Sequence, residues 1–227
     1  MNKIRRMTAA ELSTAALRQQ ILSREILPGS RVTEDAVASE LGVSRATVRQ
    51  ALNSLELEGL LVRNPTSRVL EVLSLDADDV KEIYQARRVL ELAGVEASAN
   101  APEEALEELK QAVTQMKEAA ENTDFVGFVE ADARSHAVTV GFLNSRVLSD
   151  THASLMRRIR LAITHLEEDE NVLVDELLQH EKFCDLVLEG KIEEAKRNLA
   201  TRLDASEQAM LRSLITPQKP RSTAGAQ

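Results

Sequence analysis

Four hydrogen-bonding residues, Ser44, Arg45, Thr47 and Arg49, occur within six positions of the chain. In a helix, Arg45 and Arg49 would lie one turn apart on the same outward face. A guanidinium group can pair with guanine O6 and N7 or with a phosphate, and the hydroxyls of Ser44 and Thr47 suit phosphate contacts near a helix N-terminus. The spacing indicates a helix that contacts DNA. The alternative is an ordinary solvated helix face, because arginine is usually exposed.

A second group of ionisable residues falls inside apolar stripes of helical period. Asp132 and His136 are four residues apart, so one helix face can present a carboxylate and an imidazole to a single ion, with His180 as a third ligand. Arg87 and Arg202 also fall on inward stripes, where they can pair with an anion. This pattern predicts a polar pocket that binds a divalent metal such as zinc, an anionic small molecule, or both. For each residue alone, a hydrogen-bonded position in the core is the alternative.

The elements that must position the first group are short helices. Thr33 and Ser44 are predicted N-caps, and Gly42 between them supplies a tight turn. The helix after Ser44 has a predicted buried face of Val48, Leu52 and Leu55. Upstream, an apolar stripe of Leu12, Ala16, Ile21 and Leu22 predicts one more helix. This is the order of a helix-turn-helix with its recognition helix starting after Ser44.

Two short strands are predicted after the recognition helix, in residues 60–63 and 68–72, around a polar turn at 64–67. Together they would form a two-stranded wing. Arg63 and Arg68 on this wing can follow a phosphate backbone or enter a minor groove. Solvated hairpin arginines are the alternative.

From Leu75 onward the chain consists of segments with helical period, separated by short breaks. The segments are residues 77–99, 103–121, 124–143, 146–167, 171–189 and 191–212. We therefore predict a mainly α protein, in which a winged helix-turn-helix of three helices and a two-stranded wing precedes an all-α bundle of about six helices. The expected domains are 1–72 for the winged helix, 73–77 for a linker, 78–213 for the helical domain and 214–227 for a disordered polar tail.

Composition limits the class of protein. Residues 1–72 hold ten Lys and Arg against eight Asp and Glu, a balance of +2, while the rest of the chain carries −11 of the total charge of −9. The acidity therefore belongs to the helical domain, and the first domain can still present a positive face to DNA.

The only cysteine, Cys184, lies on an apolar stripe, which favours a buried inert thiol. No apolar run reaches the ~18 residues of a membrane span, so we expect a cytoplasmic protein.

The string PGSRVTEDAVASELGVSRATVRQALNSLELEGLL, which starts at Pro28, resembles the winged-helix domain of GntR-type bacterial transcription regulators. The resemblance covers roughly the first 72 residues. The chain departs from the family where it carries Ala46-Thr47 in place of the frequent Thr-Pro, and where the wing tip 64–67 has no glycine. The resemblance implies a dimer that places two recognition helices on double-stranded DNA.

Roughly residues 76–212 resemble the FCD effector-binding domain that often follows this winged helix. The matching segments are 87–91, 132–136, 141–144, 180, 188–190 and 195. In that family an Asp and three His commonly bind a divalent metal, while arginines and an asparagine help to hold a small organic acid. The resemblance assigns metal ligation to Asp132, His136 and His180, and adds Asn144 as a contact to the effector. Arg202 stands at the position of the expected third histidine.

A guanidinium at position 202 repels a cation and attracts an anion. We therefore hypothesise that Arg202 and Arg87 clamp an effector carboxylate, while Asp132, His136 and His180 fix its hydroxyl or keto group through hydrogen bonds or a weakly held metal. The whole chain is interpreted as a homodimeric regulator, most simply a repressor, whose affinity for a pseudo-palindromic operator changes when a small carboxylic acid binds. Two alternatives remain, an architectural DNA-binding protein with a vestigial pocket and a metal-dependent enzyme.

Overall fold

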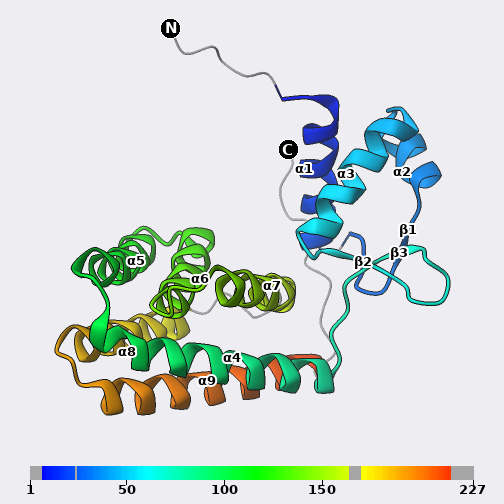
Figure 1. Cartoon of the computed structure of the whole chain (residues 1–227). Helices are drawn as coiled ribbons and strands as arrows, with labels where there is room; N and C mark the ends of the chain where they lie inside the picture. Colours follow the sequence, from blue (N-terminus) through cyan, green and yellow to red (C-terminus); the bar gives the residue numbers. More distant parts are fainter. Residues whose placement is uncertain (1–6, 24, 164–169, 216–227) are drawn as a thin grey trace, which may run out of the picture. The chain divides into compact units, whose positions relative to one another are not determined.

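The computed structural model describes residues 7–23, 25–163 and 170–215, with the backbone alone for 160–163, 170–173 and 215. The described residues form two compact units (Figure 1). The first comprises residues 7–75, the second residues 76–156 and 170–215, and residues 157–163, the end of a helix that starts in the second unit, group with the first. The first unit contains three helices and a small sheet. The second contains helices only.

The elements of the first unit are α1 (Ala9–Leu22), β1 (Arg31–Val32), α2 (Glu34–Leu41), α3 (Arg45–Leu57), β2 (Leu61–Arg63) and β3 (Leu70–Val72). The strands form one antiparallel sheet in the order β1-β3-β2. The predicted two-stranded wing was therefore incomplete, because β1 adds a third strand against β3. With two residues, β1 is too short to show the alternating pattern by which a strand is read from sequence.

The helix-turn-helix has the predicted local structure. Thr33 and Ser44 cap α2 and α3, and Gly42 adopts the left-handed conformation (φ 64°) between the two helices. The predicted buried face of α3 is confirmed, since Val48, Leu52 and Leu55 lie in the core of the first unit.

The predicted stripe of α1 was wrong at two positions. Leu12 is 56% exposed and Ala16 is exposed, while the neighbouring Ser13 and Thr14 are buried. Their hydroxyls donate to the carbonyls of Ala9 and Ala10, each at 2.8 Å. Because these bonds satisfy the hydroxyls within the helix, two polar residues can occupy positions that a hydropathy pattern assigns to apolar ones. The buried face of α1 also includes Leu17 and Ile21.

The helices of the second unit are α4 (Ala77–Ala97), α5 (Glu103–Glu121), α6 (Phe125–Gly141), α7 (Arg146–Ile163), α8 (Glu170–Leu188) and α9 (Ile192–Ile215), with a 3₁₀ turn η1 (Ser98–Asn100) after α4. The six predicted segments are therefore confirmed as helices. The tail was predicted to begin at residue 214, but α9 continues through Ile215. Residues 164–167 of the fourth predicted segment, and 216–227 of the predicted tail, lie outside the described residues.

Packing within the second unit brings five helices around one interior. α4 and α9 lie side by side, α6 packs on α4 and α5, and α8 packs on α5 and α9 (Figure 1). α4 and α6 approach closely at Gly94, where a Cβ atom would lie 2.1 Å from the carbonyl oxygen of Thr139. No helix in the described part of the chain is long and apolar enough to cross a membrane.

The connection between the units begins with a core residue. Leu73, which we expected to start the linker, is 6% exposed in the core of the first unit. Its N–H donates to the carbonyl of Leu60 at 3.0 Å. The next helix starts at Ala77 with Asp76 as its N-cap.

Candidate functional site

The first candidate site is the exposed end of α3. Ser44 accepts the N–H of Thr47 at 3.2 Å, and the two hydroxyl oxygens lie 2.9 Å apart. These bonds cap the N-terminus of the helix. Ser44 and Thr47, which are predicted to contact DNA, therefore also stabilise the start of α3. Both side chains remain at the surface or partly exposed there.

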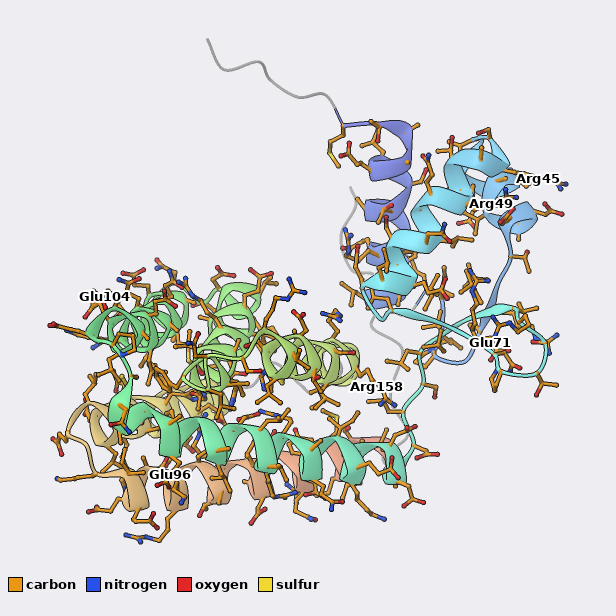
Figure 2. All side chains as sticks on the ribbon, in the orientation of Figure 1. Arg45, Arg49, Glu71, Glu96, Glu104 and Arg158 are labelled. Atoms are coloured by element: carbon orange, nitrogen blue, oxygen red, sulfur yellow. The ribbon has the colours of Figure 1, made fainter. Side chains whose placement is uncertain are left out.

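Arg45 and Arg49 lie on the surface of this unit, with side chains 69% and 63% exposed (Figure 2). Both pair with acidic residues from the first turn of α2. Arg45 Nε lies 2.9 Å from Asp35 Oδ1, and Arg49 donates two hydrogen bonds to Glu34, at 2.7 and 2.8 Å. Exposed ion pairs of this kind contribute little to stability, so a phosphate or a base edge can replace the carboxylate. The geometry is compatible with the predicted role of both arginines.

The wing carries the other two predicted arginines. Arg63 is exposed on β2 and its guanidinium lies 2.8 Å from Glu56 Oε2. At the tip, Asn64 Oδ1 accepts the N–H groups of Thr66 and Ser67, both at 3.0 Å, which closes the turn without a glycine. Arg68 takes the left-handed conformation (φ 61°) that a glycine would adopt more easily. The tip is therefore ordered by side-chain hydrogen bonds, and Arg68 is exposed on it.

The second candidate site is a buried polar cluster that consists of Arg87, Glu91, Asp132, His136, His152, His180 and Arg202. It lies inside the second unit and takes residues from α4, α6, α7, α8 and α9. Glu91, with 0% exposure, is its central acceptor. Its carboxylate accepts from Arg87 Nε at 2.7 Å and from His136 Nδ1 at 2.6 Å, and lies 3.1 Å from His152 Nε2.

The electrostatics of this cluster keep its carboxylates charged. Burial acts to raise the pKa of Glu91, but His136 and Arg87 lower that pKa well below the usual range. Burial also acts to raise the pKa of Asp132, and His136 and His180 lower it in the same way. The pKa of the His136 imidazole is lowered, chiefly by burial. At neutral pH a neutral His136 therefore donates its Nδ1 proton to ionised Glu91.

Asp132, His136 and His180 bring three acceptor atoms together, all within 4.8 Å of one another. Because Nδ1 of His136 donates to Glu91, its Nε2 is left as an acceptor, 3.6 Å from Asp132 Oδ1. Nδ1 of His180 lies 2.8 Å from the carbonyl oxygen of Glu176 and donates to it, which leaves Nε2 facing the carboxylate of Asp132. That Nε2 lies 2.8 Å from Asp132 Oδ1. A cation among these three atoms could contact all of them.

Arg202 supplies a positive charge at this place. Its Nη2 hydrogen-bonds Nε2 of His180, and its guanidinium carbon lies 5.6 Å from the ring centre of Phe183. The donor set alone would suit a divalent metal, but one of its lone pairs is engaged by Arg202, and the guanidinium charge repels a metal ion. With Arg202 in this position, Asp132, His136 and His180 do not fit a resident metal.

The structure thus unites most of the predicted effector residues, with three differences. Asn144 is exposed, in the left-handed conformation (φ 48°) at the turn after α6, and so lies outside the buried cluster. Glu91 was not among the predicted site residues, and it joins three residues of the cluster. His152 had been missed, although Leu148, Leu155 and Ile159 share its face of α7 at helical spacing and could have indicated an inward position.

Comparisons with known proteins agree with both units. Residues 82–205 match the model of the FCD domain, and residues 13–70 match that of the gntR family of bacterial regulatory proteins. The HTH-type transcriptional regulator YdhC of Bacillus subtilis (strain 168) is 32% identical over 136 residues, which cover 59% of this chain and 60% of that protein. A second HTH-type transcriptional regulator, from the TAR-I ttuE-ttuC' intergenic region of Agrobacterium vitis, is 32% identical over 141 residues, 59% of this chain and 81% of that protein.

Two further relatives extend the comparison. The gluconate operon transcriptional repressor of Bacillus licheniformis is 30% identical over 129 residues, which cover 56% of this chain and 52% of that protein. The crystal structure of a GntR regulator from Rhodococcus sp. RHA1 superposes with a TM-score of 0.71 at 26% identity, over 91% of this chain and 99% of that one. The chain therefore belongs to the GntR family of bacterial transcription regulators and carries an FCD domain.

Proposed function

We propose that this regulator binds a pseudo-palindromic operator as a homodimer, and that a small carboxylic acid bound at the buried polar cluster changes its affinity for DNA. Two-fold symmetry of the protein would match two-fold symmetry of the operator. We propose repression as the mode of control, which is also the activity named for the Bacillus licheniformis relative. Membership of a family of transcription regulators sets aside the metal-dependent enzyme that the sequence left open.

The observation that carries the effector proposal is an unsatisfied donor in the cluster. Among the buried side-chain atoms of the described residues, three lack a hydrogen-bond partner: Gln20 Oε1, Asn198 Oδ1 and Arg202 Nε. Arg202 Nε is the only N–H donor of the three, and it belongs to a charged group. A buried donor without a partner is costly, and a carboxylate oxygen would satisfy it.

The surroundings of Arg202 narrow the class of acid. Arg87 is 3% exposed and already pairs with Glu91, so its role is to hold Glu91 rather than to clamp the effector as we had hypothesised. Asp132, with a side chain 25% exposed, is the more accessible of the two carboxylates in the cluster. Asp132 and Arg202 both contact Nε2 of His180. An acceptor beside a guanidinium suits a ligand that carries a hydroxyl and a carboxylate. We therefore favour small aliphatic hydroxy acids.

Thermal unfolding of the full chain tests this proposal. We expect lactate or malate, but not pyruvate or succinate, which lack the hydroxyl group, to raise the unfolding temperature in the presence of EDTA, since a ligand that binds only the folded state stabilises it. Arg202→Gln should remove the effect, whereas Arg197→Gln, at an exposed position on the same helix, should retain it. If no acid stabilises the protein, an architectural DNA-binding protein with a vestigial pocket becomes the better interpretation.

A second measurement tests the coupling to DNA. The acid that stabilises the protein should change the operator affinity by about 5- to 150-fold, the usual range of a coupling between two sites. An acid that binds without any change in operator affinity would contradict regulation by that acid.

A further inference from the structure

The two arginines of the buried polar cluster are matched by two carboxylates. Arg87 and Arg202 supply two positive charges, and Glu91 and Asp132 supply two negative ones. A divalent metal would add two positive charges next to the guanidinium of Arg202, which repels them. Ions inside a protein are tolerated when they are paired, and the present set is already paired.

Arg202 is held in position from two sides. Its Nη2 donates to Nε2 of His180, whose other nitrogen is fixed by the carbonyl of Glu176. Its guanidinium faces the ring of Phe183, which is 2% exposed. A cation over an aromatic face is attracted by the ring, so Phe183 favours the charged group at this place. The His180 ring in turn lies edge-on to His136, with ring centres 5.7 Å apart.

We propose that the guanidinium of Arg202 is the resident cation of this cluster and takes the place that a metal ion would occupy among Asp132, His136 and His180. An arginine remains charged at any physiological pH, so the cluster holds this cation without drawing on a metal supply. The site differs from a metal centre in one functional respect, since a ligand anion meets directional N–H donors rather than open coordination positions. This inference concerns the site of the proposed effector, but its test requires no acid.

The test is metal binding by the full chain, measured as zinc content after purification and by titration with Zn²⁺ alone. We expect the wild-type protein to contain far less than one zinc per chain. Arg202→His removes the guanidinium and offers a third imidazole to the same three acceptors. We expect this variant to bind one Zn²⁺ per chain, roughly 100-fold more tightly than the wild type.

Three controls make the result specific. Arg197→His adds a histidine to the same helix at an exposed position and should not increase zinc binding. Arg202→Gln removes the charge without adding a ligand, so its zinc affinity should fall between those of the wild type and Arg202→His. Asp132→Asn in the Arg202→His background should abolish the gain. Circular dichroism of each variant checks that the helical unit is folded.

Two outcomes would overturn the proposal. One is a wild-type protein that holds one Zn²⁺ per chain and loses it in Asp132→Asn, because Arg202 would then leave the cluster when the metal binds. The other is a folded Arg202→His variant with no gain in zinc affinity, because Arg202 would then not be what excludes the metal. Failure of every acid to bind would affect the proposed effector but neither of these measurements.

Discussion

Glu91 joins the residues of the buried polar cluster that come from three different helices. Arg87 on α4, His136 on α6 and His152 on α7 all contact its carboxylate, and each of these four side chains is buried. If one partner of a buried ion pair is removed, the other keeps an uncompensated charge. The resulting loss of folding free energy exceeds the net stabilisation that the intact pair provides. The Glu91 side chain therefore links α4, α6 and α7 in the interior of the helical domain.

The variant Glu91→Gln should lower the free energy of unfolding by roughly 3–5 kcal/mol at neutral pH, because Arg87 keeps a buried charge without its carboxylate. The low pKa of Glu91 means that its stabilising effect is present above the usual carboxyl pKa and is lost as the pH falls toward the folded value. The difference between variant and wild type should therefore shrink in acid. Urea unfolding at a series of pH values measures both effects.

Glu104→Gln is the matched control for this prediction, since Glu104 is exposed on α5 (Figure 2). We expect it to change the unfolding free energy by about 0.5 kcal/mol or less. A Glu91→Gln protein as stable as this control would show that the cluster tolerates an unpaired Arg87.

At the scale of elements, the close crossing of α4 and α6 determines how the two halves of the cluster meet. α4 supplies Arg87 and Glu91, and α6 supplies Asp132 and His136. The two backbones approach at Gly94, next to Thr139, because glycine has no side chain to separate them. A shift of either helix would separate Glu91 from His136.

Gly94→Ala should destabilise the protein by about 1–3 kcal/mol, because its Cβ would lie 2.1 Å from the backbone oxygen of Thr139, which cannot rotate away. Gly141→Ala is the control, since a Cβ there meets nothing within 4 Å. The control should be neutral or slightly stabilising, as helical glycine usually is when replaced by alanine. Equal unfolding temperatures of the two variants would contradict the close crossing.

At the scale of the whole molecule, charge is divided unevenly along the chain. The first 72 residues carry +2 and the remainder −11. Attraction to the phosphate backbone must therefore come from the winged helix, and the acidic helical domain opposes non-specific binding. The exposed pairs of Arg45 with Asp35 and of Arg49 with Glu34 hold these arginines at the surface of the winged helix.

The affinity of the full chain for a mixed-sequence DNA duplex should fall as the salt concentration rises, and a plot of log affinity against log salt concentration should be a straight line. Arg49→Ala should reduce the slope by about one per bound protomer if the guanidinium contacts a phosphate. Arg146→Ala, whose side chain is 92% exposed in the helical unit, should leave the slope unchanged. An Arg49→Ala protein with the wild-type slope would assign Arg49 to base reading or to no DNA contact.

The sequence by itself determined the helices, the recognition helix and its caps, and most of the cluster. Local signals suffice for these, because capping residues act within one turn and the buried face of α3 repeats at helical spacing. It also placed Asp132, His136, His180 and Arg202 on inward faces. It misassigned the stripe of α1, where Ser13 and Thr14 satisfy their hydroxyls inside the helix.

Only the tertiary structure decided which inward residues meet. Glu91 joins α4 to α6 and α7, and the tautomers of His136 and His180 follow from Glu91 and the carbonyl of Glu176. His136 and His152 lie 45 and 61 positions from Glu91, so no spacing rule connects them to it. The third strand β1 likewise pairs with residues 70 and 71, about forty positions further along the chain. Periodicity reports the direction of a side chain, but the crossing of helices determines what it touches.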